Sequence, residues 1–217
     1  FAADWEVHFN SSRTGVRLIG PKPEWARNDG GEAGLHPSNI HDNAYAIGAV
    51  DFTGDMPVIL GPDGPSLGGF VCPVTVIQAD LWKLGQLKAG DKIRFTPVSH
   101  DTAVNLRNEQ LKQLDSLKYQ HSEVSEYLPD SPVLKTIDTE SHPTGVVYRP
   151  AGDNYLLIEY GPLQLDIRLR FRVHALMESL QSREIPGIIE MTPGIRSLQI
   201  HYDSLTLKQT DLLELLI

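Results

Sequence analysis

The residues best suited to bind a small polar molecule are concentrated between residues 28 and 70. Glycines in this stretch let the backbone approach a ligand closely, and Asn, Ser, His and carboxylate side chains add hydrogen-bond donors and acceptors. Its candidate polar contacts are His36, Ser38, Asn39, Asp51, Asp55 and Ser66. Stretches rich in Gly, Asp and Asn are also typical of turns between strands. Each segment therefore has a structural interpretation beside the functional one.

The spacing of these residues does not match three well-known kinds of site. His36, His41 and Asp42 contain metal-ligating side chains, but His-x4-His-Asp on a loop fixes no coordination geometry, and we predict no metal site. The glycines around Ser66 stand at the wrong offsets for a Gly-x-Ser-x-Gly nucleophile elbow. Residues 61–69 lack the Gly-Lys-Ser/Thr end of a phosphate-binding loop.

Composition excludes several classes of partner. The 217-residue chain is 41% hydrophobic and 22% charged, which is enough to bury a core. Its formal net charge of −9 argues against a nucleic-acid or anionic membrane surface. Its apolar runs are far shorter than the roughly 20 residues of a membrane span. The single Cys72 excludes an intramolecular disulfide and favours a reducing compartment, so we expect a cytoplasmic protein.

Residues 1–98 are predicted to be mostly β-structure. Apolar and polar residues alternate from Trp5 to Phe9, as in a half-buried strand, and turns rich in Gly and Pro separate the apolar runs. Further strands are expected at residues 16–19, 58–60, 71–77 and 92–95, and one short helix at about 78–87. Many short strands with one small helix indicate a closed or nearly closed β-structure.

The rest of the chain divides into a connection and an α+β part. Residues 99–144 contain a helical pattern at 104–118, followed by several prolines, and are predicted to be a linker with a helix. In residues 145–217 we predict strands at 146–149, 155–160, 188–191 and 197–202. Helices are predicted at 166–181 and from Thr210, which is a suitable N-cap. This order fits a small antiparallel sheet with helices on one face. We interpret both ends as cut from a longer polypeptide.

Several phrases together resemble one family. Those in the first part are residues 12–18, 34–39, 54–60 and 63–70; those in the second are 149–153, 171–173 and 192–198. They are similar to the carboxyltransferase region of biotin-dependent urea carboxylase, which is also found within urea amidolyase. Residues 1–98 resemble the C-terminal half of its KipA-like part (allophanate hydrolase subunit 2-like). Residues 145–217 resemble the start of its KipI-like part (subunit 1-like).

The resemblance implies both a fold and a reaction. It implies a cyclophilin-like β-barrel for residues 1–98 and a small antiparallel α+β domain for residues 145–217, both truncated. A separate biotin carboxylase domain would use ATP and bicarbonate to form carboxybiotin, and a biotinyl carrier domain would bring it here. The carboxyl group would then pass to a urea nitrogen, giving allophanate. The missing remainder of the carboxyltransferase region would complete the active site.

Within this resemblance, each candidate residue has an expected role. Asp55 and Ser66 are predicted as catalytic, and Asp51, Asn39, His36 and Ser38 as substrate-binding. Gly64, Leu67, Gly68 and Gly69 are predicted to contact carboxybiotin, and backbone N–H groups of residues 30–34 are a further candidate. A carboxylate at Asp51 suits a guanidinium cation, whereas Asn would suit neutral urea better. Guanidine is therefore an alternative substrate, unless Asp51 is only a strand-end residue facing solvent or an arginine.

Two alternative functions remain open at this stage. The chain could be a 5-oxoprolinase-type subunit, or a non-catalytic regulatory module like the KipI/KipA pair. The KipA-like part precedes the KipI-like part on one polypeptide, which favours urea carboxylase. A biotin carboxylase domain and a carrier domain in the parent polypeptide would exclude both alternatives.

Overall fold

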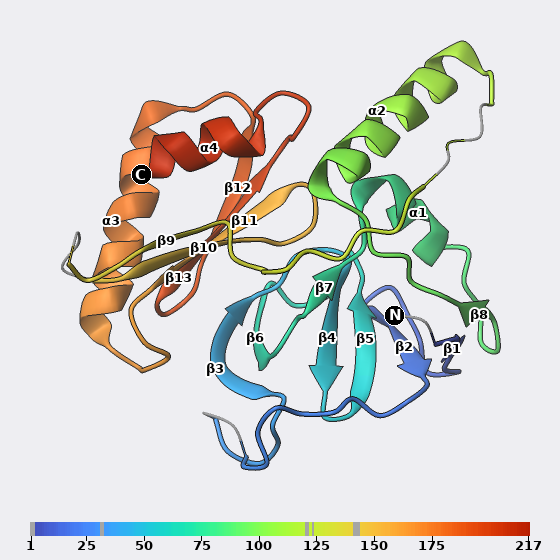
Figure 1. Cartoon of the computed structure of the whole chain (residues 1–217), viewed down its shortest axis with the longest axis horizontal. Helices are drawn as coiled ribbons and strands as arrows, with labels where there is room; N and C mark the ends of the chain where they lie inside the picture. Colours follow the sequence, from blue (N-terminus) through green and yellow to red (C-terminus); the bar gives the residue numbers. More distant parts are fainter. Residues whose placement is uncertain (1–2, 31–32, 120–121, 123, 141–143) are drawn as a thin grey trace.

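The computed structural model describes residues 3–30, 33–119, 122, 124–140 and 144–217. Three sheets, all antiparallel, organise these residues (Figure 1). The first part of the chain contains a six-stranded sheet with the order β7-β4-β5-β2-β1-β8 and a two-stranded sheet of β3 and β6. Its elements are β1 (Trp5–Val7), β2 (Gly15–Ile19), β3 (Asn39–Ala44), β4 (Ala49–Thr53), β5 (Met56–Leu60), β6 (Leu67–Phe70), β7 (Val74–Thr75), η1 (Gln78–Asp80), α1 (Leu81–Leu84) and β8 (Lys92–Ile93).

The second part is built on a five-stranded sheet with the order β12-β13-β11-β10-β9. Its elements are β9 (Lys135–Ile137), β10 (Val146–Pro150), β11 (Tyr155–Tyr160), α3 (Ile167–Arg183), β12 (Ile188–Pro193), β13 (Ser197–Tyr202) and α4 (Gln209–Leu216). Helix α2 (His100–Ser116) connects the two parts and projects away from both sheets in Figure 1.

Each part has a core of its own. In the first part, Val7, Val16, Leu18, Val50 and Ile59 are almost completely buried together. The second core joins strands β10, β11 and β13 to both helices, and α3 and α4 cover the same face of the sheet. The predicted fold class, mostly β-structure followed by a small antiparallel α+β unit, is confirmed by these sheets.

The two parts share a smaller hydrophobic cluster. Tyr45, Ala49 and Leu60 from the first part bury against Tyr155 of β11. Beside this cluster, the backbone N–H of Gln78 donates a 2.9 Å hydrogen bond to Oδ1 of Asp153. The two parts therefore pack as one body.

Five element predictions need correction. Strands β3, β4 and β6 lie within residues 28–70, a stretch for which only the strand at 58–60 is predicted from the sequence. Of the strand predicted at 71–77, only Val74–Thr75 is a strand. The helix predicted at 78–87 is η1 followed by the short helix α1. Helix α2 begins at His100, because the Ser99 hydroxyl accepts a hydrogen bond from the Thr102 N–H. Helix α4 begins before Thr210, whose hydroxyl donates to Asp211.

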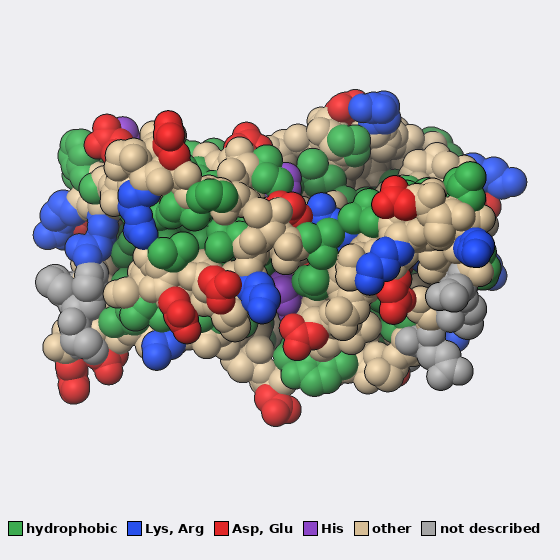
Figure 2. Space-filling view, turned by 90° about the horizontal axis from the view of Figure 1, so that it is seen from above, with side chains coloured by type: hydrophobic (Ala, Val, Ile, Leu, Met, Phe, Trp, Pro, Cys, Tyr) green, Lys and Arg blue, Asp and Glu red, His purple; other side chains and the backbone are tan. Residues whose placement is uncertain are grey.

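Charges are mixed on the surface. On the face shown in Figure 2, acidic and basic side chains are interspersed among apolar and uncharged ones rather than gathered into a basic area. Within the described ranges, none of the helices combines the length and apolar character needed to cross a membrane.

Candidate functional site

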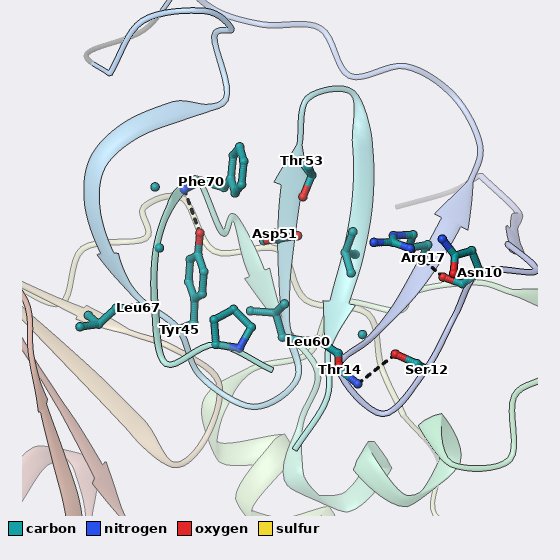
Figure 3. A pocket seen from close by; sticks show the side chains of 15 residues that line it. Asn10, Ser12, Thr14, Arg17, Tyr45, Asp51, Thr53, Leu60, Leu67 and Phe70 are labelled. Atoms are coloured by element: carbon teal, nitrogen blue, oxygen red, sulfur yellow. Dashed lines mark hydrogen bonds between the residues drawn. The ribbon is translucent and has the colours of Figure 1, made fainter. Parts of the chain in front are cut away.

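A cavity of about 380 Å³ lies between the six-stranded sheet and the two-stranded β3–β6 sheet. Its volume falls in the range of roughly 300–1,000 Å³ that is typical of small-molecule sites. Figure 3 shows polar and apolar side chains around it. The polar ones are Asn10, Ser12, Thr14, Arg17, Tyr45, Asp51 and Thr53. The apolar ones include Val58, Leu60, Leu67 and Phe70.

Strand register places core and cavity on opposite faces of the same sheet. Ile59 of β5 pairs with Val16 of β2 on one side and with Val50 of β4 on the other, and all three are buried in the core. The next residue of β5, Val58, pairs with Arg17 and Asp51. Because side chains alternate between faces, this second row faces the cavity.

Asp51 has the most unusual environment in the cavity. Its side chain is only 5% exposed, and its Oδ1 has no hydrogen-bond partner among the described residues. Burial raises the pKa of Asp51 to about 6, while a hydrogen bond from Thr53 and the charge of Arg17 oppose the rise. A buried polar atom without a partner costs free energy. Asp51 lines the cavity, and a hydrogen bond from a ligand to its carboxylate would offset this cost.

Arg17 faces Asp51 across the cavity without forming an ion pair with it. The two residues are separated by β5, and two strand spacings amount to roughly 10 Å. Arg17 is held by its Nη1, which donates a 2.9 Å hydrogen bond to the Asn10 carbonyl. Figure 3 shows the Asp51 carboxylate between Arg17 on one side and Tyr45 on the other. A small ligand between them meets an acceptor and a donor.

Strand β6 forms the opposite wall and is fixed by Tyr45. The Tyr45 hydroxyl accepts a 2.9 Å hydrogen bond from the Phe70 N–H, and its own backbone N–H donates to the Ser66 carbonyl. A Cβ atom on Gly68 would overlap the Tyr45 ring. Burial raises the pKa of the Tyr45 phenol, so it stays protonated. Gly68 is therefore required by the packing of this wall.

A second polar cluster lies outside the cavity lining. His36 Nδ1 is 2.9 Å from the Ser38 hydroxyl, and His36 Nε2 is 3.5 Å from Oδ1 of Asp55. Asp55 also accepts a 3.0 Å hydrogen bond from Trp25 and is 3.1 Å from the Lys22 ammonium. These partners, Trp25 first, lower the pKa of the Asp55 carboxyl.

This cluster has the residue types of a Ser–His–Asp triad but not its accessibility. Ser38 is 0% exposed, whereas the nucleophilic serine of such a triad is accessible to the substrate. Its neighbour Asn39 and the carbonyl of Pro37 are held by the Arg27 guanidinium, which donates to both backbone carbonyls. The arrangement shapes the turn that leads into β3.

The structure thus brings together only some of the predicted site residues. Asp51, Leu67, Gly68 and Gly69 line the cavity. His36, Ser38, Asn39 and Asp55 form the second cluster, and Ser66 contributes its carbonyl to Tyr45. Gly64 belongs to a turn, where its N–H donates to the Gly61 carbonyl. Of the further backbone candidate, residues 30–34, positions 31 and 32 lie outside the described residues.

Arg17, Tyr45 and Thr53 are cavity residues that the sequence reasoning missed. For Arg17 a signal existed, because it alternates with Val16 and Leu18 and so belongs on the face opposite the core. For Tyr45 no comparable signal existed, since it lies next to a strand that was expected to be a loop. Across the described residues, no group of three or more His, Cys, Asp or Glu side chains could hold a metal ion.

Comparison with known proteins adds a family to this geometry. Residues 1–97 match the family model described as "Carboxyltransferase domain, subdomain A and B", and residues 146–217 match "Carboxyltransferase domain, subdomain C and D". The chain belongs to the carboxyltransferase family. The resemblance based on the sequence phrases is confirmed.

The similar proteins are much longer than this chain. It is 48% identical to a urea amidolyase of Lachancea kluyveri and 46% identical to one of Saccharomyces cerevisiae, in each case over 100% of this chain and 12% of the relative. The crystal structure of the K. lactis urea amidolyase superposes with a TM-score of 0.90 at 48% identity, over 98% of this chain and 13% of that one. The chain therefore spans about an eighth of the length of these relatives.

Proposed function

We propose that this chain forms part of the carboxyltransferase site of a biotin-dependent urea carboxylase, a ligase that moves the carboxyl group of carboxybiotin to a urea nitrogen to give allophanate. The observation that carries the proposal is the buried carboxylate of Asp51, which lines a ligand-sized cavity and has one oxygen without a hydrogen-bond partner among the described residues. Membership of the carboxyltransferase family supports it.

The polar groups of the cavity suit urea. An N–H of urea would donate to Asp51 Oδ1, and the urea carbonyl would accept from the Arg17 side, so both ends of a neutral ligand find partners. Guanidinium offers donors alone, and the Asp51 carboxylate already accepts a hydrogen bond from Thr53. The positive charge of guanidinium would also be repelled by Arg17. We therefore favour urea, with guanidine as the alternative.

The β6 wall fits a flat, largely apolar cofactor ring. Gly68 and Gly69 present backbone without side chains, and Leu67 and Phe70 add apolar surface. Carboxybiotin, when bound, would supply the activated carboxyl group. In this proposal, Leu67, Gly68 and Gly69 hold the cofactor ring against the wall, and Asp51 orients the accepting nitrogen toward it.

The remaining parts of the reaction belong to the rest of the parent polypeptide. A biotin carboxylase domain would use ATP and bicarbonate, a biotinyl carrier domain would deliver the cofactor, and the remainder of the carboxyltransferase region would complete the site. We expect this enzyme in the cytoplasm. The catalytic roles assigned to Asp55 and Ser66 stay predictions, as do the substrate roles of His36, Ser38 and Asn39 and the carboxybiotin contact of Gly64.

The test compares urea with guanidine in the intact parent enzyme. ATP- and bicarbonate-dependent carboxylation is measured as kcat/KM for each compound, in the wild type and in Asp51→Asn. We expect urea to be preferred and the variant to lose activity toward it. A preference for guanidine that the variant reverses would establish the alternative substrate. If neither compound is carboxylated, the proposed function is wrong.

A further inference from the structure

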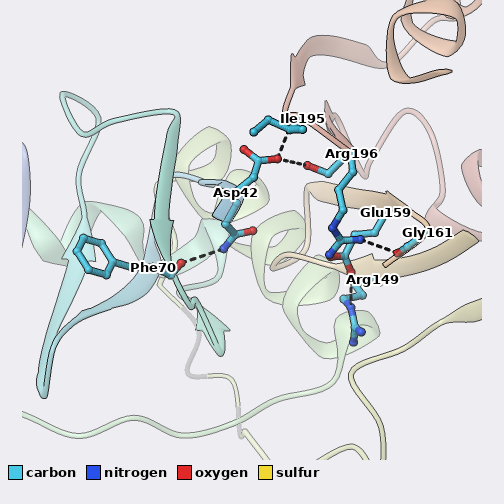
Figure 4. A network of polar contacts seen from close by, with 9 residues as sticks. Asp42, Phe70, Arg149, Glu159, Gly161, Ile195 and Arg196 are labelled. Carbon is cyan, nitrogen blue, oxygen red and sulfur yellow. Dashed lines mark hydrogen bonds and ion pairs between the residues drawn. The ribbon is translucent and has the colours of Figure 1, made fainter. Parts of the chain in front are cut away.

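The two parts of the chain meet at a carboxylate on β3, shown in Figure 4. Oδ2 of Asp42 accepts a 2.8 Å hydrogen bond from the backbone N–H of Ile195, which is 153 residues away, and lies 3.3 Å from the Ser197 hydroxyl. Both partners belong to the second part, at the turn between β12 and β13. A Cβ atom on Gly194 would overlap the Asp42 carboxylate. Gly194 has no positive φ, so the close approach of the Asp42 carboxylate and of the Ser197 hydroxyl is the reason for glycine there.

The turn that binds Asp42 is itself rigidly held. Arg196 is only 8% exposed, and its Nη2 lies 2.5 Å from Oε1 of Glu159 on β11. The other oxygen of Glu159 lies 2.7 Å from Arg149 Nε on β10. Arg196 Nη1 also donates to the Gly161 carbonyl. The position of the turn is therefore set by the sheet of the second part (Figure 4).

Asp42 is also connected to the cavity wall. The next residue, Asn43, donates from Nδ2 to the Phe70 carbonyl at 3.3 Å, and the Phe70 N–H donates to the Tyr45 hydroxyl. Phe70 ends β6, the strand that carries the glycine wall, and β6 pairs with β3. The register of that pair is irregular between Asn39 and Asn43. Two short, irregular strands need outside contacts to fix their position.

We propose that Asp42 is a positioning residue, through which the β12–β13 turn of the second part sets the place of the β6 wall relative to Asp51. The inference rests on the proposed function, since it concerns how the carboxyl donor is aligned with the nitrogen held by Asp51. Asp51 itself is on β4, in the other sheet. Loss of the Asp42 contact therefore displaces the donor wall and leaves the substrate anchor in place.

The test uses the intact parent enzyme and separates kcat from KM. For Asp42→Ala we expect kcat for urea carboxylation to fall by ~10–100-fold, because misplacement by about 1 Å costs this much in rate. KM for urea should change by less than about threefold, since the ground-state contact to Asp51 remains. Biotin-dependent ATP hydrolysis without urea should be unchanged. Asp42→Asn keeps an acceptor for the Ile195 N–H and should restore most of kcat.

A second substitution approaches the same contact from the other side. Gly194→Ala pushes a methyl group into the Asp42 carboxylate, so we expect a similar fall in kcat. In the double variant with Asp42→Ala, the carboxylate is gone, and the combined loss should be smaller than the product of the two single losses. This non-additivity is the sign of a direct coupling.

The matched control is Arg107→Gln. It removes a different contact to the second part, the ion pair that Arg107 of α2 forms with Asp203. Arg107 Nη1 lies 3.2 Å from Oδ1 of Asp203, and neither residue belongs to the β3–β6 sheet. We expect wild-type kcat for this variant. Wild-type kcat for Asp42→Ala would overturn the inference, as would equal losses for Arg107→Gln and Asp42→Ala. If Asp42→Ala does not fold, the inference is tested by the other two variants, Asp42→Asn and Gly194→Ala, and wild-type kcat for Gly194→Ala would then overturn it. Absence of carboxylation in the wild type would instead reject the proposed function.

Discussion

Replacing Asp51 by Asn should make the protein more stable while it makes the enzyme less active. Burial raises the pKa of this carboxyl from an ordinary 3.8 to about 6. For a carboxyl whose pKa is higher in the folded than in the unfolded state, the charged form opposes folding. The resulting loss of stability is complete above pH 6 and disappears as the pH falls toward 3.8.

The size of the effect follows from the pKa difference. Each pH unit is equivalent to about 1.4 kcal/mol, so the rise from 3.8 to about 6 corresponds to roughly 3 kcal/mol at pH 8. The amide of Asn keeps one polar group without a partner, at a cost of about 1 kcal/mol. We therefore expect Asp51→Asn to add about 2 kcal/mol to the free energy of unfolding at pH 8. For a chain of this length the gain raises Tm by about 4–8 °C.

Thermal unfolding of the 217-residue chain, followed by circular dichroism from pH 4 to 8, measures this gain. Heat is preferable to chemical denaturants, because urea and guanidinium are the candidate ligands. The matched control is Asp63→Asn, an exposed carboxylate whose pKa is lowered by its 2.6 Å ion pair with Arg13. That substitution should give no increase in Tm at pH 8. If Asp51→Asn lowered Tm at pH 8, the buried carboxylate would have a stabilising partner and the reasoning would be refuted.

The same substitution removes the acceptor offered to the substrate. A hydrogen bond to a charged group is worth about 1.5–3 kcal/mol, so kcat/KM of the parent enzyme should fall by about 10–150-fold. In the wild type, activity should rise with pH through about 6 as Asp51 ionises. A variant that is more stable and less active is expected where a functional group is buried at the cost of stability.

Three further outcomes are expected. Gly68→Ala should destabilise the chain by about 1–3 kcal/mol, measured as a lower Tm, because its methyl group overlaps the Tyr45 ring. Ser38→Ala should lower the unfolding free energy by about 0.5–1.5 kcal/mol through the lost contact with His36, measured by thermal unfolding. Arg17→Met should raise KM for urea at least about tenfold in steady-state kinetics, if a charge-assisted hydrogen bond to the urea carbonyl is lost.

The sequence was sufficient for elements whose pattern is local. The short run at residues 16–19 predicts a strand, and the helical spacing from Leu169 to Leu180 predicts α3 to within a few residues. The chemistry of its side chain is enough to make Asp51 a candidate site residue. What the pattern could not tell is that Asp51 stands in the middle of a strand, with its oxygen in a cavity.

Strand β3 shows why the rest could not be predicted. Its residues include Asn39, Asp42 and Asn43, which have low β-propensity and favour turns. The strand is stabilised by long-range partners instead. Asp42 binds the N–H of Ile195, and Asn43 binds the carbonyl of Phe70. The residues around Asp42 in the sequence do not indicate that its partner lies 153 residues away.

The same strand register determines both the packing of the first core and the geometry of the cavity. The row Val16, Ile59 and Val50 fills the core, and the adjacent row places Arg17 and Asp51 in the cavity. A slip of one residue between these strands would exchange the two rows, because side chains alternate. It would bury two charged groups in the core and leave the apolar row in the cavity. The cost of burying unpaired charges therefore holds the register, and the register in turn holds the acceptor and the donor on opposite sides of the cavity.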